Sequence, residues 1–136
     1  MSRRPCVLLV VVSLSLLIAG PAVADSLRAD RSVAGVRATL RTYDNALLTG
    51  NAKAGCALFT KRAQVQLART NHVASCTDVI KKAAALLGAN SKEAAAVRAY
   101  ASKAHVTLSG SIATVTKLDG SGTSTLTYLR GLWYLS

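Results

Sequence analysis

The chain has 136 residues, with 17 Lys or Arg against 6 Asp or Glu and a formal net charge of +11. About half of the residues (51%) are apolar, so the chain is too apolar to be intrinsically disordered, and it is too short for two ordinary domains. This length also excludes a multi-domain enzyme with its own large cofactor. We expect a single domain without a cofactor.

The first residues have the features of a secretory signal peptide. Arg3 and Arg4 precede an apolar run over residues 7–19, and small residues follow as far as Ala24. Signal peptidase cleaves after such small residues. A retained membrane anchor is the alternative, although the run is shorter than the roughly 20 residues that cross a bilayer. We therefore expect removal of residues 1–24, which would leave a secreted or extracytoplasmic protein with a net charge of +9.

The cysteine count is informative once the signal peptide is set aside. Cleavage removes Cys6 and leaves two cysteines, Cys56 and Cys76, 20 positions apart. An even count in an exported chain favours a disulfide, which at this spacing would stabilise the fold by about 3 kcal/mol. A redox pair would have Cys-x-x-Cys spacing, and a metal site would need more ligands than His72 and His105 offer. We expect a structural disulfide and no metal site.

The mature chain is predicted to begin with a flexible polar leader, residues 25–32, followed by its clearest helix. Apolar residues recur at steps of three and four over residues 33–47, as on one face of a helix. Ser32 or Asp30 can cap its start, and Gly50 can end it in the left-handed conformation. One face of this helix carries Val36, Leu40, Tyr43 and Leu47, and the other side carries Arg37, Arg41 and Asp44.

More helices are expected before the chain changes character. The pattern predicts a short helical stretch over residues 52–59, a second helix over 61–69 capped by Thr60, and a third that begins at Thr77 or Asp78 and ends at Gly88 and Asn90. The next segment, residues 91–101, fits two structures. Its alanines favour a helix, whereas its last residues also fit the start of a strand.

Beyond residue 104 the apolar residues recur with a period of two, and threonines and β-branched residues predominate. Short connections that contain glycine separate the apolar runs, which is typical of β-hairpins. The predicted strands are His105–Leu108, Ile112–Lys117, Thr125–Leu129 and Leu132–Leu135. Helices followed by an antiparallel meander indicate an α+β fold in which helices cover one face of a sheet.

This order resembles the NTF2-like (cystatin-like fold) superfamily, in particular small exported members of unknown function of the actinobacterial type. The similarity covers residues 33–135. Besides the opening helix, it is carried by Cys56-Ala57-Leu58-Phe59-Thr60, Ser75-Cys76, Gly110-Ser111-Ile112-Ala113-Thr114-Val115 and Trp133. The resemblance implies one NTF2-like domain over residues 33–136, with N-terminal helices packed on a curved antiparallel sheet that forms a cone. Related families use the enclosed pocket for small apolar ligands or for catalysis.

The resemblance also indicates which residues would line that pocket. They come from the apolar face of the first helix and from the strands that face it. The expected lining is Val36, Leu40, Tyr43, Leu47, Val106, Leu108, Val115 and Leu126. Tyr43 is the best polar candidate, either as a core residue or as a hydrogen-bond donor to a ligand. Burial of an apolar ligand against such a lining is favourable and needs no catalytic group.

The sequence contains few candidate catalytic groups. Enzymatic relatives place carboxylates, tyrosines or histidines in the pocket, but the only acids after Asp78 are Glu93 and Asp119, and Asp119 lies in an Asp-Gly turn. His105 could act as a base at the entry to a strand, although a lone histidine is more often a surface residue. We therefore expect no catalytic residues. The alternative is a small isomerase, lyase or hydrolase that uses pocket tyrosine or histidine residues.

The expected function is accordingly that of an exported, non-catalytic domain that binds a small apolar ligand or a protein or envelope partner. Its basic residues are spread along the chain, which favours weak attraction to an anionic envelope component rather than binding to nucleic acid. Strand alternation puts Thr125, Thr127 and Leu129 on one face and Leu126 and Tyr128 on the other. The outward face could be covered in a homodimer that forms through the sheet, or it could be hydrated directly.

Overall fold

The computed structural model describes residues 27–136, and the predicted signal peptide lies outside the described residues. In this range five helices precede a four-stranded antiparallel sheet, which confirms the α+β prediction. The helices are α2 (Val33–Thr49), α3 (Ala52–Ala57), α4 (Lys61–Thr70), α5 (Cys76–Ala89) and α6 (Ser91–Lys103). The strands are β1 (His105–Ser109), β2 (Ile112–Thr116), β3 (Thr123–Leu129) and β4 (Leu132–Leu135).

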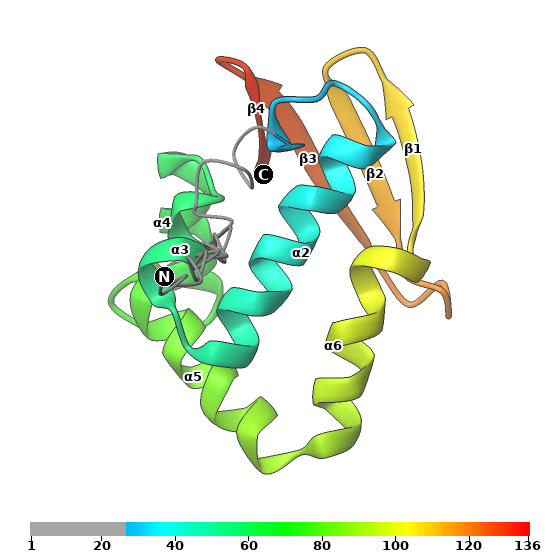
Figure 1. Ribbon diagram of the computed structural model, residues 1–136. Helices are drawn as coiled ribbons and strands as arrows, with labels where there is room; N and C mark the ends of the chain where they lie inside the picture. Colours follow the sequence, from blue (N-terminus) through cyan, green and yellow to red (C-terminus); the bar gives the residue numbers. More distant parts are fainter. Residues whose placement is uncertain (1–26) are drawn as a thin grey trace, which may run out of the picture.

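Helix α2 occupies the centre of the molecule, between α6 on one side and the group α3–α5 on the other (Figure 1). Its start is fixed by Ser32, whose side chain accepts a hydrogen bond from the amide of Gly35 at 3.3 Å. Its end is fixed by Gly50, which has a φ of 70° and closes the helix in the left-handed conformation. Both boundaries were predictable from the sequence, because the residue types perform these tasks locally.

The caps of the next helices agree with the predictions in part. Thr60 caps α4, as expected, by accepting from the amide of Ala63. Helix α5 begins at Cys76 rather than at Thr77 or Asp78, because Ser75 is the cap: its hydroxyl accepts from the amide of Asp78 at 3.3 Å. Gly88 does not end α5, which continues for one more residue.

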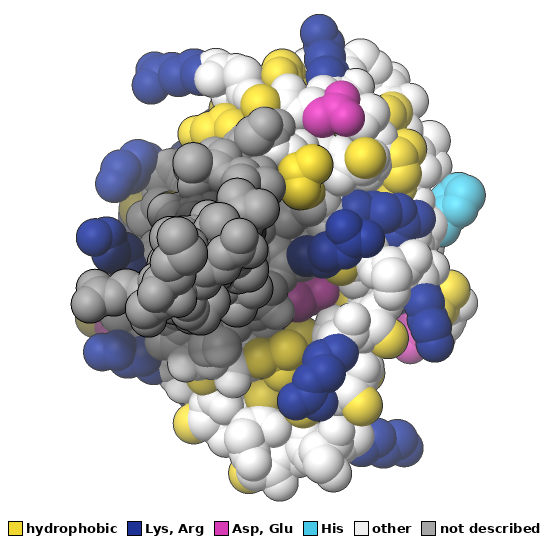
Figure 2. Space-filling view, viewed as in Figure 1, with side chains coloured by type: hydrophobic (Ala, Val, Ile, Leu, Met, Phe, Trp, Pro, Cys, Tyr) yellow, Lys and Arg dark blue, Asp and Glu magenta, His cyan; other side chains and the backbone are white. Residues whose placement is uncertain are grey.

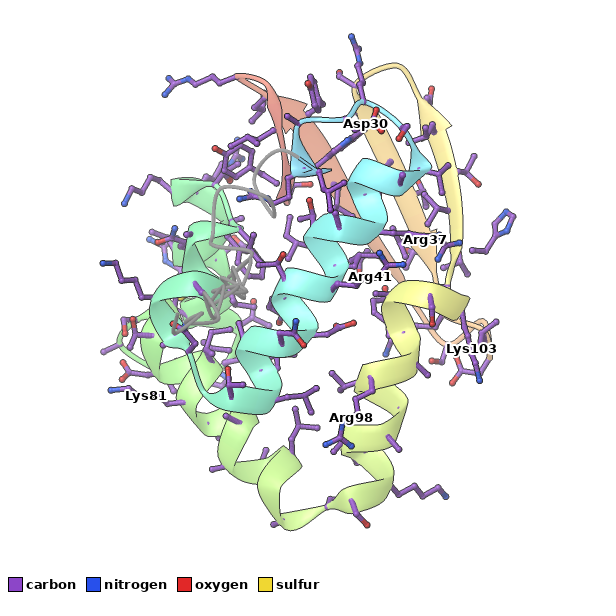
Figure 3. The ribbon with its side chains drawn as sticks, viewed as in Figure 1. Asp30, Arg37, Arg41, Lys81, Arg98 and Lys103 are labelled. Atoms are coloured by element: carbon purple, nitrogen blue, oxygen red, sulfur yellow. A yellow bond between two sulfur atoms is a disulfide. The ribbon has the colours of Figure 1, made fainter. Side chains whose placement is uncertain are left out.

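The segment that fitted either a helix or a strand is helical. Asn90 follows α5 and caps α6, accepting from the amides of Lys92 and Glu93 at 3.2 Å. At the other end of α6 the guanidinium of Arg37 donates to the carbonyl oxygens of Ala101 and Ala104 at 2.6 and 3.1 Å (Figure 3). These bonds satisfy carbonyls that a helix end leaves unpaired.

The strands pair in the order β1-β2-β3-β4, as a meander. Ala113 on β2 pairs with Leu126 on β3, which pairs with Leu135 on β4, and this row lies on the face that packs against the helices. On the outer face Thr107, Thr114 and Thr125 pair in a row across three strands. The threonine-rich face of β3 is therefore the outward one.

Two clusters of buried side chains hold these elements together. The larger one joins α2, α6 and the sheet, and the smaller one joins α2, α3 and α5. Tyr43 and Phe59 pack against both clusters, and their rings meet edge to face with centroids 5.5 Å apart. The larger cluster comprises Val36, Leu40, Leu58, Ala101, Ala104, Ala113, Val115, Leu126, Trp133 and Leu135.

The described residues of the predicted leader contact the sheet, which the amino-acid composition does not predict. The indole N–H of Trp133 donates to the carbonyl of Asp30 at 2.9 Å, and the hydroxyl of Tyr128 donates to the carbonyl of Ala29 at 2.7 Å. Arg28 is buried and donates to the carbonyl of Trp133 at 3.0 Å. These bonds connect residues about a hundred positions apart and tie the leader to β3 and β4.

The disulfide predicted between Cys56 and Cys76 is present, with Cα atoms 6.0 Å apart. It joins α3 to the first residue of α5. Because Ala52 of α3 belongs to the same small cluster as Cys76 and Ile80 of α5, the bond reinforces a contact that apolar packing already makes.

We predict that Gly35→Ala destabilises the fold by about 1–3 kcal/mol. A Cβ at this position would collide with the carbonyl oxygen of Asp30 and lie 3.1 Å from the indole nitrogen of Trp133. The matched control is Gly88→Ala in α5, where a Cβ meets nothing within 4 Å and where alanine should raise helix stability by up to about 1 kcal/mol. Urea denaturation measures both, and equal effects of the two substitutions would contradict the close approach.

We also predict that the double substitution Cys56→Ala with Cys76→Ala lowers the free energy of unfolding by about 3 kcal/mol. The disulfide restricts the unfolded chain across a separation of 20 residues, so its loss stabilises the unfolded state. Urea denaturation with and without a reductant checks this, because the reductant should destabilise the parent protein and leave the double variant unchanged. Two free thiols in non-reduced parent protein would disprove the bond.

Candidate functional site

The eight residues predicted to line a pocket fall into different environments. Four of them, Val36, Leu40, Val115 and Leu126, lie in the larger core cluster with at most 1% of their surface exposed. Tyr43 and Val106 pack against that cluster, and Leu47 packs against the smaller one. Leu108 remains 37% exposed on β1. The structure thus brings half of the set together as packed core, and the prediction of a ligand against these residues stays a prediction.

A surface hollow of about 570 Å³ lies between the start of α4 and the β3–β4 hairpin, and we call it the α4–hairpin hollow. Its size falls in the range of about 300–1,000 Å³ that is usual for small-molecule sites. The hollow combines aromatic and aliphatic side chains with two cations. It is lined by Ala57, Phe59, Thr60, Lys61, Gln64, Leu129, Arg130 and Tyr134.

The hollow exists because the chain between α3 and α4 attaches to the edge of the sheet. The amide of Leu135 on β4 donates to the carbonyl of Leu58 at 2.8 Å, and Phe59 forms a parallel bridge with Leu135. The side-chain amide of Gln64 donates to the carbonyls of Cys56 and Phe59 at 2.8 and 3.2 Å. These bonds hold Phe59 in place beside both α4 and the hairpin.

Arg130 reaches the rim of the α4–hairpin hollow from an unusual backbone conformation. The two-residue turn between β3 and β4 consists of Arg130, with a φ of 50°, and Gly131, with a φ of 82°. Such turns require a positive φ at both residues, and asparagine or glycine adopts it more easily than arginine. The hairpin therefore has a modest conformational free-energy cost at Arg130, the residue that carries the charge.

A second hollow of about 400 Å³ adjoins the first along α4. The two share Lys61 and Gln64, and the second also contains Arg69 and Cys76. Val65, on the exposed side of α4, lines it with 52% of its surface exposed. Lys61 thus stands where the two hollows meet.

A buried polar cluster lies apart from both hollows, where α2 packs against α6. Asp44 is only 5% exposed, and its Oδ2 has no hydrogen-bond partner within the described residues. Burial raises the pKa of the Asp44 carboxyl from 3.8 to about 6, and a backbone hydrogen bond from Ala101 lowers it in part. The buried hydroxyl of Tyr100 also lacks a partner in this part of the chain. The pKa of Tyr43 is raised mainly by burial, and to a smaller extent by the charges of Asp44 and Tyr100.

Asp44 is not among the predicted site residues, because it shares with Arg37 and Arg41 the side of the helix opposite the apolar face. That side is where α6 packs, and Figure 3 shows Arg37 and Arg41 on the side of α2 that faces α6. An acidic residue and two arginines spaced along one side of a helix do not indicate that the acidic residue is buried. Only the position of α6 reveals it.

The remaining candidates of the sequence do not assemble into a site. His105 and His72 are both exposed, and Asp119 lies in an exposed turn where its carboxylate accepts from the amide of Ser121. Among residues 27–136 no group of three or more His, Cys, Asp or Glu side chains could hold a metal ion. Over the same range no helix is long and apolar enough to span a bilayer.

Comparisons with known proteins add no assignment. No family model, curated protein or solved structure matches this chain.

We predict that Asp44→Asn removes a pH dependence of stability. The folded pKa of about 6 lies above the ordinary 3.8, so the folded state binds the proton more tightly and the parent protein loses stability as the pH rises from about 4 to 6. Above that range the variant should be the more stable, by less than about 3 kcal/mol, the free-energy equivalent of this pKa difference. Urea denaturation between pH 4 and 8 measures this, with Glu93→Gln on the exposed side of α6 as the control. A variant less stable than the parent at pH 7 would contradict the assignment.

Proposed function

We propose that this protein is an exported, non-catalytic domain of the NTF2-like kind that binds a small apolar ligand in the α4–hairpin hollow. The observation that supports the proposal best is the hollow itself, which has a volume of about 570 Å³ and presents Phe59, Leu129 and Tyr134 to a ligand. Concave sites of this size with a mostly apolar lining and few polar groups are typical of ligand binding. The proposal places the ligand closer to the surface than the resemblance implied.

Two features support export. The disulfide between Cys56 and Cys76 is of the structural kind that persists in oxidising compartments. The first 24 residues have the sequence pattern of a cleaved signal peptide. Cleavage there would leave Arg28 and Asp30, which hold the leader to the sheet, inside the mature chain.

The arrangement of helices supports the NTF2-like part of the proposal. A long helix packs on the inner face of an antiparallel meander, and a short segment at Leu58 and Phe59 joins the edge of the sheet before the later helices begin. The same two residues belong to the Cys56-Ala57-Leu58-Phe59-Thr60 segment that carries the resemblance to this superfamily.

A second candidate function, acid–base catalysis, has one specific observation in its favour. Asp44 is buried, has a pKa of about 6 and lies next to Tyr43 in the chain, and a carboxyl with such a pKa can transfer protons near neutral pH. Neither hollow is lined by Asp44, however. A substrate in either hollow would not contact this carboxyl, so binding is the function that the geometry supports better.

We also propose partners from the chemistry of the surface. Figure 2 shows Lys and Arg side chains scattered over one face rather than gathered in a single patch, which supports weak attraction to an anionic envelope component more than binding to nucleic acid. The outward positions of the described strands include Thr107, Thr114, Thr125 and Tyr134 and no Lys, Arg, Asp or Glu. An uncharged sheet face on a cationic protein supports pairing of two copies there.

We predict that Leu129→Ser weakens binding of the neutral fluorescent probe N-phenyl-1-naphthylamine about fivefold, because it removes one apolar wall of the α4–hairpin hollow. Leu129 is 44% exposed, so the substitution should change stability little. The matched control is Leu86→Ser on α5, where the side chain is 65% exposed and lines neither hollow. Fluorescence titration compares the three proteins. Absence of probe binding to the parent, or equal affinities of the two variants, would refute the proposed site.

A further inference from the structure

We infer that the α4–hairpin hollow takes an amphipathic monoanion, whose charged group lies at the rim between Lys61 and Arg130 and whose apolar body lies against Phe59, Leu129 and Tyr134. This inference rests on the proposed function and names the class of ligand. Carboxylates or sulfonates attached to an aromatic ring or an alkyl chain have this chemistry.

The charges around the hollow point to an anion. Two of the lining residues, Lys61 and Arg130, are cationic, and none of those that the structure describes there is acidic. The described acids all lie elsewhere: Asp30, Asp44, Asp78, Glu93 and Asp119. No carboxylate in the hollow therefore competes with a ligand for the two cations.

The start of α4 adds to the positive potential. Lys61 is the first residue of this ten-residue helix, and the first turn contains no acidic side chain. The amides of a helix N-terminus attract negative charge, and acidic residues normally compensate for them. Here Lys61 and the exposed Arg62 occupy those positions instead.

The other polar groups of the hollow are engaged or carry only a hydroxyl. The Gln64 amide nitrogen donates to two backbone carbonyls, and Thr60 and Tyr134 offer hydroxyl groups. An anionic group in the hollow would therefore find its charged donors at Lys61 and Arg130. This restriction orients the ligand, with its charge at the rim and its apolar part inward on Phe59.

The backbone conformation of Arg130 allows the effect of a substitution on ligand binding to be distinguished from its effect on stability. Its φ of 50° favours asparagine over arginine, so Arg130→Asn should preserve or raise stability while it removes a cation from the rim. If Arg130 served only the turn, its replacement by asparagine would not weaken anion binding.

The test uses two fluorescent probes that differ only in a sulfonate group, 1-anilinonaphthalene-8-sulfonate and the neutral N-phenyl-1-naphthylamine. The parent protein should bind the sulfonate more tightly, and this preference should weaken as ionic strength rises. Arg130→Asn and Lys61→Gln should each reduce the affinity for the sulfonate about fivefold relative to the affinity for the neutral probe. Arg62→Gln, next to Lys61 but outside the lining, is the matched control.

Each outcome decides a different point. A preference for the sulfonate that disappears in the double variant Lys61→Gln with Arg130→Asn, but not in Arg62→Gln, supports the inference. Equal binding of the two probes to the parent protein, or a preference that persists in the double variant, overturns it while the proposed function stands. Failure of both probes to bind overturns the inference and the proposed function together.

Discussion

The burial of Trp133 joins the two ends of the described chain. Its side chain is fully buried against α2 and the sheet, its indole N–H donates to the carbonyl of Asp30, and its own carbonyl accepts from Arg28. A buried indole N–H left without an acceptor would cost about 1–3 kcal/mol. The leader must therefore stay beside β4, and Gly35 must lack a side chain to let the Asp30 carbonyl approach.

The position of β4 in turn creates the α4–hairpin hollow. Because β4 is the last strand of the sheet, its outer edge is free to bond to the segment between α3 and α4, and Leu58 takes that place through its carbonyl. A single bridge is too short to continue the sheet, so the chain turns away into α4 and leaves space above Phe59. The space is thus a consequence of how the edge strand is covered. Its cations come from the two elements that diverge at this point, α4 and the hairpin.

The interface between α2 and α6 has a different character, because it encloses polar groups that are only partly satisfied. Arg37 spans the interface and bonds to the end of α6, whereas Asp44 and Tyr100 are each left with an unpartnered buried oxygen within the described chain. Ala101 on α6 is small and buried at this interface, which allows the two helices to approach closely. Close packing there removes the Asp44 carboxyl from water, which is the physical cause of its raised pKa.

The elements whose signals are local could be predicted from the order of the amino acids. Ser32, Thr60 and Gly50 act on the backbone next to them, the alternation of β3 sets which residues share a face, and the two cysteines among the described residues have one pairing. The packing of the whole domain sets which element covers which face. It made residues 91–103 a helix, buried Asp44 beneath it, and brought Phe59 and Lys61 to Arg130 across about seventy residues. The reason is physical: periodicity records that a face is apolar or polar, but the partner of that face depends on packing between segments that are distant in the chain.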